Sequence, residues 1–178
     1  MGAVNESLRG KLLIASPQLA DYFRRTVVLV VEHNEDGAMG IVLNRRTDAE
    51  VREVVPSLAA MAEEDDVVHA GGPVEPDTVI ALGDFEDPSE AGARVTGSIG
   101  VLDPDRPEPA LRRLRVFAGY AGWTPGQLDA EMEQEAWIVT FAEADDPFWS
   151  EDLWPRVVQR KGGEFVLMST MPVDPKLN

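Results

Sequence analysis

Cysteine is absent from this 178-residue sequence, and so are long apolar runs. Without thiols the chain has no disulfide framework, no thiolate nucleophile and no zinc or iron–sulfur site built on cysteine. The longest strongly apolar stretch, residues 27–31, has the size of a strand and falls far below the ~18 residues of a membrane helix. Residues 1–10 also lack the charged-then-apolar layout of a secretory signal. We therefore expect a cytoplasmic protein that does not enter a membrane.

Positive charge is scarce, because 16 lysines and arginines face 32 aspartates and glutamates, for a formal net charge of −16. Such a chain repels polyanions, so direct binding to nucleic acid is disfavoured. Arginines nevertheless occur in pairs, at positions 24–25, 45–46 and 112–113. The simplest interpretation of these pairs is solvated surface, and the alternative is a local positive patch on an acidic body.

The length of the chain suits a single domain, residues 1–178, which can bury roughly 70% of its unfolded surface without cross-links. Runs of β-branched and apolar residues predict strands. Asp36-Gly37 predicts a tight hairpin, because glycine accepts the positive φ that the reversal requires. The expected strands are residues 12–15, 26–31, 38–44, 67–70, 78–82, 99–102, 115–118 and 137–141, with 26–31 at the centre of the sheet.

Four helices are expected between these strands. Asp48 is placed to cap a short first helix, and residues 105–114 are expected to form a second helix with arginines in its last turn. The Thr-Pro-Gly-Gln segment at 124–127 predicts a helix start with a capping box, and residues 153–160 are the last helix. The acidic residues 83–97, rich in Gly and Pro, are expected to form a solvated loop. Because helices and strands mix without regular βαβ alternation, the predicted fold class is α+β.

Four sequence blocks carry a resemblance to a known family. They are GKLLIASP at residues 10–17, VEHNEDGAMGIVLN at 31–44, GGPV at 71–74 and VFAGYAGWTPGQL at 116–128, and the ending MPVDPKLN at 171–178 fits the same pattern. In order and spacing these blocks resemble the bacterial YqgE/AlgH family, and departures are confined mainly to residues 83–97. The resemblance implies an α+β domain whose mixed, largely antiparallel, branched sheet curls into a partial barrel with helices packed outside. The family has no established biochemical activity, and one branch carries the label of a transcriptional regulator.

The chain has two histidines, His33 and His69, each at the end of a predicted strand. Histidine is the natural acid–base group near neutral pH, and two imidazoles on neighbouring strands, with Glu32 or Glu35, could ligate a metal. Neither histidine stands in an HxH or HExxH spacing, so we predict no metal site and no cofactor. The simpler interpretation is that His33 caps the hairpin and His69 packs beside Gly71.

The glycine-rich segments 71–73 and 119–123 allow two interpretations. Backbone nests in these segments, with the helix that begins near Pro125, could bind an anion between Tyr120 and Trp123. Alternatively, the glycines let chains cross closely in a curled sheet while the aromatic rings fill the core. We favour the second interpretation, because no phosphate-binding motif accompanies the glycines.

The leading functional hypothesis is a non-enzymatic cytoplasmic module that binds an unknown small ligand or protein through residues 33–37, 71–74 and 119–127. A regulatory role would be compatible with such a module. We expect a monomer or a weak homo-oligomer. One alternative is a hydrolase or metal-assisted enzyme centred on His33 and His69, and another is a transcriptional regulator that acts through protein contacts. No serine stands in a G-x-S-x-G context, and no catalytic residue is assigned. The candidate ligand-binding residues are His33, Asn34, Asn44, Gly71, Gly72, Pro73, Gly119, Tyr120, Trp123 and Gln127.

Overall fold

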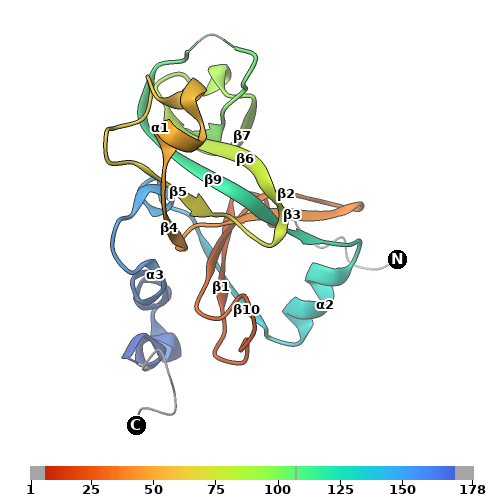
Figure 1. Ribbon diagram of the computed structural model, residues 1–178. Coiled ribbons are helices and arrows are strands. Elements are labelled where there is room, and N and C mark those ends of the chain that lie inside the picture. Colours follow the sequence, from red (N-terminus) through yellow and green to blue (C-terminus); the bar gives the residue numbers. More distant parts are fainter. Residues whose placement is uncertain (1–6, 107, 171–178) are drawn as a thin grey trace.

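The computed structural model describes residues 7–106 and 108–170, which form a large branched sheet with short helices around it (Figure 1). The strands are β1 (Lys11–Ala15), β2 (Val27–Asn34), β3 (Gly37–Val42), β4 (Arg46–Glu50), β5 (Val67–Ala70), β6 (Val74–Phe85), β7 (Ala93–Thr96), β8 (Ile99–Val101), β9 (Leu111–Trp123) and β10 (Trp137–Phe141). The α-helices are α1 (Val51–Val54), α2 (Gln127–Glu133) and α3 (Leu153–Lys161). Shorter 3-10 helices are η1 (Pro56–Leu58), η2 (Pro88–Glu90), η3 (Asp146–Phe148) and η4 (Gly163–Thr170).

The sheet branches at β9. Along its main path the strand order is β10-β1-β2-β3-β9-β6-β8-β7, and β5 pairs both with β9 and with β4. The β5–β9 pair is parallel, and the other described pairs are antiparallel. The end strands β10 and β7 do not pair with each other in the described part of the chain, so the sheet is not closed into a barrel. The predicted α+β class and branched, largely antiparallel sheet are confirmed, whereas the curl into a partial barrel stays a prediction.

Strand β2 is covered on both faces, which explains its continuously apolar sequence. Val27 and Leu29 belong to one hydrophobic cluster, and Val28 and Val30 belong to another. Helix α3 packs on the first cluster through Trp154, and α2 packs on the second. The two helices accordingly lie on opposite sides of β1 and β10 (Figure 1). An interior strand with two buried faces is what the run of β-branched residues predicts.

The β2–β3 hairpin also forms as predicted. Asn34 pairs with Gly37 across the turn, and Gly37 has a φ of 126°. An L residue rarely adopts that φ, so glycine is needed where β3 begins.

A third hydrophobic cluster supports the upper part of the molecule in Figure 1, where α1 and η1 cover β6 and β9. Phe85 of β6 is its largest fully buried side chain. The remaining buried members are Val51, Val68, Ala81, Leu102 and Val116. This cluster fixes the first half of β9 against its neighbours.

Residues 105–114 do not form the predicted helix, because β9 begins at Leu111 and runs antiparallel to β6. Leu111 and Leu114 have the spacing of a helix face, which is why the sequence suggested one. A short helix is marginal on its own, whereas pairing with β6 satisfies the main-chain groups of the whole segment. Arg112 and Arg113 therefore lie on a strand, where they can reach across the sheet.

Two shorter predictions are also wrong. Asp48 does not cap a helix but lies inside β4, where Arg46 pairs with His69, and Glu50 is the N-cap residue of α1. Residues 83–97 are not one loop, because β6 continues to Phe85 and β7 pairs with β8. In both places a neighbouring strand supplies main-chain partners that the local sequence does not reveal.

The predicted helices are present as α2 and α3, but the predicted start of the first at Thr124 is wrong, because α2 begins at Gln127 with Gly126 as its N-cap residue. Helix α3 ends at Lys161, and Gly162 follows it with a φ of 76°. No helix in the described part of the chain is long and apolar enough to cross a membrane. The family-like ending at 171–178 lies outside the described residues. The assignment of residues 1–178 to a single domain stays a prediction.

Candidate functional site

The glycine-rich blocks meet where β3, β5 and β6 join β9, at a point that we call the glycine junction (Gly71, Gly72 and Gly119). The main-chain N–H of Gly71 donates to Ala118 (2.8 Å), and its carbonyl accepts from Val42 (2.8 Å). A β-carbon on Gly71 would overlap the carbonyl of Gly119, and one on Gly119 would overlap the carbonyl of Gly72. The structure confirms that these glycines allow main chain to pass close to main chain.

The polar residues predicted near the junction have internal partners. Asn44 accepts from the N–H of Val27 (3.0 Å) and donates to the carbonyl of Arg25 (2.8 Å), whose φ is 56°. The hydroxyl of Tyr120 donates to Glu75 (3.0 Å), and this hydrogen bond raises the pKa of Tyr120. Asn44 thus connects the loop at Arg25 to the end of β3. Tyr120 of β9 is hydrogen-bonded to Glu75 of the neighbouring strand β6. Pro73 is exposed beside the junction.

Trp123 does not wall a pocket but lies in the core. It is 7% exposed, packs edge-on against Trp137 with ring centroids 6.1 Å apart, and donates to Glu131 (3.3 Å). Gln127 accepts from the N–H of Thr124 (3.0 Å), which is half of the predicted capping box, and it donates to Glu131 (3.0 Å). Both residues therefore attach α2 to the sheet, and ligand binding at residues 119–127 stays a prediction.

The two histidines are not brought together. His33 lies on β2, accepts from the N–H of Leu8 (2.9 Å) and stands 4.0 Å from Asp129. His69 lies on β5, which pairs with β4 and β9 and not with β2. Among the described residues no group of three or more His, Cys, Asp or Glu side chains could hold a metal ion. Asn34, next to His33, accepts from Asp36 within the hairpin turn (2.8 Å).

His69 is a buried, neutral imidazole. Burial, then the charges of Arg115 and Arg46, lower the pKa of His69 to about 4, against an opposing hydrogen bond to the Val67 carbonyl. That contact joins Nδ1 to an oxygen that can only accept, at 3.3 Å, so Nδ1 carries the proton of the neutral ring. Nε2 is then left as a hydrogen-bond acceptor. The ring is 6% exposed and packs near Phe117.

The low pKa of His69 predicts a loss of stability in mild acid. Between pH 6.5 and about 4 the unfolded chain binds a proton at His69 that the native protein does not, so stability is present above this window and falls as the pH falls through it. The loss amounts to about 3 kcal/mol. Urea denaturation from pH 4 to 7 measures it, with His69→Gln as the variant that cannot titrate. Equal slopes for the two proteins would show that His69 carries no such linkage.

A groove of about 230 Å³ runs along the first half of β9. It is bordered by the segment that follows η1 and by η3. It combines apolar side chains with three arginines, and we call it the arginine groove. A smaller cavity of about 40 Å³ adjoins it beside His69 and Arg46. The two spaces share Asp66, Leu114 and Arg115. The other residues that line the groove are Met61, Glu63, Leu111, Arg112, Arg113 and Phe148.

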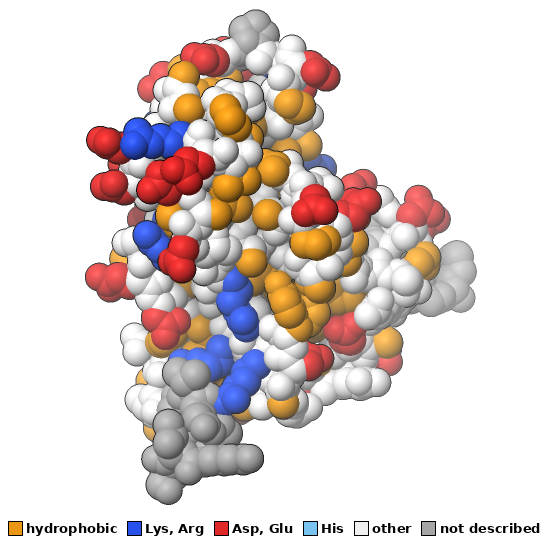
Figure 2. All heavy atoms as spheres, viewed as in Figure 1, with side chains coloured by type: hydrophobic (Ala, Val, Ile, Leu, Met, Phe, Trp, Pro, Cys, Tyr) orange, Lys and Arg blue, Asp and Glu red, His pale blue; other side chains and the backbone are white. Residues whose placement is uncertain are grey.

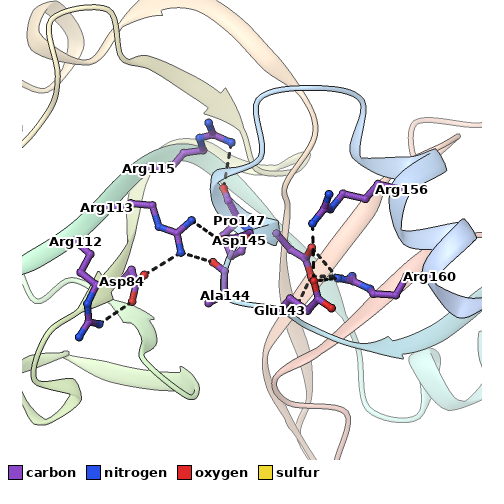
Figure 3. Close-up of polar contacts among 11 residues, drawn as sticks. Asp84, Arg112, Arg113, Arg115, Glu143, Ala144, Asp145, Pro147, Arg156 and Arg160 are labelled. Carbon is purple, nitrogen blue, oxygen red and sulfur yellow. Dashed lines mark hydrogen bonds and ion pairs between the residues drawn. The ribbon is translucent and has the colours of Figure 1, made fainter.

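Arg112 and Arg113 of the groove are neutralised within the protein (Figure 3). Arg113 pairs with Asp84 (2.9 Å) and Asp145 (2.7 Å), and Arg112 also reaches Asp84 (3.3 Å). Burial would raise the pKa of Asp84, but the hydrogen bond from Ser98 and the two guanidinium groups outweigh it and lower that pKa. Asp84 is therefore ionised at neutral pH and balances part of the positive charge.

Arg115 and Arg46 differ, because neither forms an ion pair with a carboxylate in the described part of the chain. Arg115 donates to the carbonyls of Pro147 (3.2 Å) and Trp149 (2.8 Å). Burial lowers its pKa, and nearby Asp66 opposes that shift. On the face shown in Figure 2, acidic side chains gather mainly over the upper part around α1. Arg46 of β4 and Arg115 of β9 nevertheless lie beside Asp65 and Asp66, so the described residues show no net positive patch there.

These observations define the class of protein as an α+β domain with a branched sheet, whose longest strand carries an arginine-lined groove. The chain matches the AlgH-like family over residues 12–166 and belongs to that family. Its resemblance to the YqgE/AlgH pattern is therefore confirmed.

Relatives align over almost the whole chain. A UPF0301 protein of Streptomyces coelicolor is 44% identical over 188 aligned residues, which cover 97% of this chain and 96% of the relative. A UPF0301 protein of Streptomyces avermitilis is 42% identical, with the same shares covered. The crystal structure of protein DIP2367 from Corynebacterium diphtheriae superposes with a TM-score of 0.84 at 29% identity, over 96% of this chain and 95% of that one. The solution structure of the AlgH protein from Pseudomonas aeruginosa gives a TM-score of 0.70 at 28% identity, over 97% and 98%.

Proposed function

We propose that the protein is a non-enzymatic, cytoplasmic binding module, and that its ligand is a small anionic organic molecule held in the arginine groove. The observation that carries this proposal is the position of Arg115. It faces both the groove and the cavity and has no carboxylate partner in the described part of the chain. A partly buried cation without a counterion is costly, and a bound anion would offset that cost.

The size and lining of the groove set the kind of ligand. Its volume of about 230 Å³ lies just below the roughly 300 Å³ at which typical ligand pockets begin, so the ligand is small. Met61, Leu111 and Phe148 offer apolar contact, while Arg112, Arg113 and Arg115 of β9 offer positive charge. An apolar body with an acidic group matches this combination.

The groove is preferred to the glycine junction because the candidate ligand-binding residues around the junction are engaged in the fold. Asn44, Trp123 and Gln127 each bond to main chain or to another side chain. The alternative of an enzyme centred on His33 and His69 lacks the shared centre that such chemistry requires, since each imidazole has its own separate neighbours. No specific contact favours a regulator of transcription over a metabolite-binding module.

Ligand screening followed by NMR mapping tests the proposal. A thermal-shift panel of small carboxylates and phosphate esters should contain compounds that stabilise the protein, by ~2.7 kcal/mol at 100 times the dissociation constant. Amide shifts for such a compound should concentrate at residues 61–66 and 111–115. Shifts confined to residues 71–74 and 119–127 would transfer the site to the glycine junction. A panel without any binder would overturn the proposal.

A further inference from the structure

The cavity beside His69 is enclosed by three strands and a turn. Arg46 comes from β4, His69 from β5 and Arg115 from β9, and Asp65 and Asp66 precede β5. Its volume of about 40 Å³ exceeds the ~10–15 Å³ that a single water needs, and it shares Asp66, Leu114 and Arg115 with the lining of the groove. The cavity is thus large enough for a small oxyanion, while the groove can hold an organic remainder.

Two cations, Arg46 and Arg115, and two carboxylates, Asp65 and Asp66, line the cavity. Asp65 is exposed, and Asp66 already accepts from the main-chain N–H of Glu63 at 2.8 Å. The guanidinium groups of Arg46 and Arg115 both act on His69, which shows that they lie close to the same space. Arg46 is exposed and has no ion pair with a described residue, in contrast to Arg112 and Arg113, which share Asp84. The negative charge of Asp66 acts on Arg115, but the two side chains are too far apart to form an ion pair. Neither arginine is therefore ion-paired across the cavity, and an anion placed there could contact both.

His69 selects among anions. Its Nδ1–H is occupied by the Val67 carbonyl, so Nε2 needs a donor from the ligand. Phosphate has a second pKa near 6, so near pH 6 a large share of it carries a proton that can make this contact, whereas sulfate carries none. Because burial and the charges of Arg115 and Arg46 lower the pKa of His69 to about 4, the imidazole is neutral at that pH and Nε2 can accept the hydrogen bond.

We infer that the cavity formed by Arg46, His69 and Arg115 binds a phosphate group, either free or as a monoester whose organic part extends into the arginine groove. This inference rests on the proposed function and specifies its ligand. The two guanidinium groups contact the charged phosphate oxygens. The protonated oxygen donates to Nε2 of His69, and the ester oxygen faces Leu114 and the groove.

The two imidazoles of the chain make NMR titration a direct test. Inorganic phosphate, sulfate and phenyl phosphate are titrated at pH 6 and constant ionic strength while the ring signals of His33 and His69 are followed. Phosphate should shift the His69 signals saturably and leave those of His33 in place. Phosphate should bind at least about tenfold more tightly than sulfate, because sulfate leaves Nε2 without a donor. Tighter binding of phenyl phosphate would identify a monoester, and equal binding would identify free phosphate.

Arg46→Ala is the informative variant, because Arg46 is exposed and has no ion pair within the described residues that its loss would break. It should weaken phosphate binding about tenfold or more. Arg94→Ala removes the same charge from exposed β7 and should leave binding unchanged. Silent His69 signals, equal affinity for sulfate, or equal effects of the two variants would overturn the inference. If His69 stays silent while another anion maps to the groove, the proposed function survives without phosphate.

Discussion

Gly119→Ala should destabilise the native protein by at least about 4 kcal/mol, or prevent folding altogether. Two costs combine at this position. Gly119 has a φ of 78°, and a β-carbon there would overlap the carbonyl of Gly72, which is main chain and cannot turn aside. The φ alone accounts for roughly 1–2 kcal/mol, so the overlap at the glycine junction supplies the remainder. Urea denaturation monitored by tryptophan fluorescence measures the loss.

Gly126→Ala is a closely matched control for this substitution. Gly126 has a φ of 79°, almost the same as that of Gly119, yet a β-carbon there would meet no atom within 4 Å. Its loss should therefore stay within the roughly 1–2 kcal/mol of the φ term. If the two variants lose the same stability, the close chain crossing is not what requires glycine at position 119.

Asp146→Asn should cost about 3 kcal/mol. Asp146 is 1% exposed and receives both terminal nitrogens of Arg160, at 3.1 and 2.8 Å, as well as the N–H of Glu143 at 2.7 Å. The neutral amide keeps the shape of the side chain but removes the buried charge, so Arg160 keeps only its ion pair with the less buried Glu143, at 2.8 Å. Arg160 belongs to α3 and Asp146 to η3, so this pair attaches the last helix to the segment that borders the groove.

The adjacent residue provides the comparison for that pair. Asp145 makes an ion pair of similar length with Arg113, 2.7 Å, but its side chain is 58% exposed. Water already solvates this carboxylate, so Asp145→Asn should cost less than ~1 kcal/mol. The same chemical change at consecutive positions thus separates a buried pair from a surface pair. A loss at Asp145 as large as that at Asp146 would contradict the role given to burial.

Much of the fold could be predicted from local sequence. Residues 27–31 are apolar without alternation, and both faces of that strand are indeed buried. The helix predicted at 105–114 does not form, because the leucine spacing and the arginines of this segment are compatible with a helix and with a strand alike. Only the partner strand β6, which is distant in sequence, decides between the two structures. The extended path of residues 46–50 was missed for the same reason, since β5 lies about twenty residues further along the chain.

The candidate site was harder to predict than the fold. The resemblance drew attention to the glycine-rich blocks, and the structure explains these glycines by close crossings of main chain. Arg115 carries no local signal, because its neighbours in space come from residues 46, 66 and 147–149. The arginine pairs at 45–46 and 112–113 were the available hint. Arg46 is exposed and the Arg112 side chain is 53% exposed, which agrees with their interpretation as surface residues, but the sequence does not reveal that they border adjoining spaces.

A crystal structure of the protein with phenyl phosphate tests most directly the claim that the ligand site lies along β9. The account predicts phosphate density between Arg46, His69 and Arg115, with the phenyl ring in the groove towards Phe148. Density for the compound at the glycine junction, or an empty cavity in crystals saturated with it, would contradict the account.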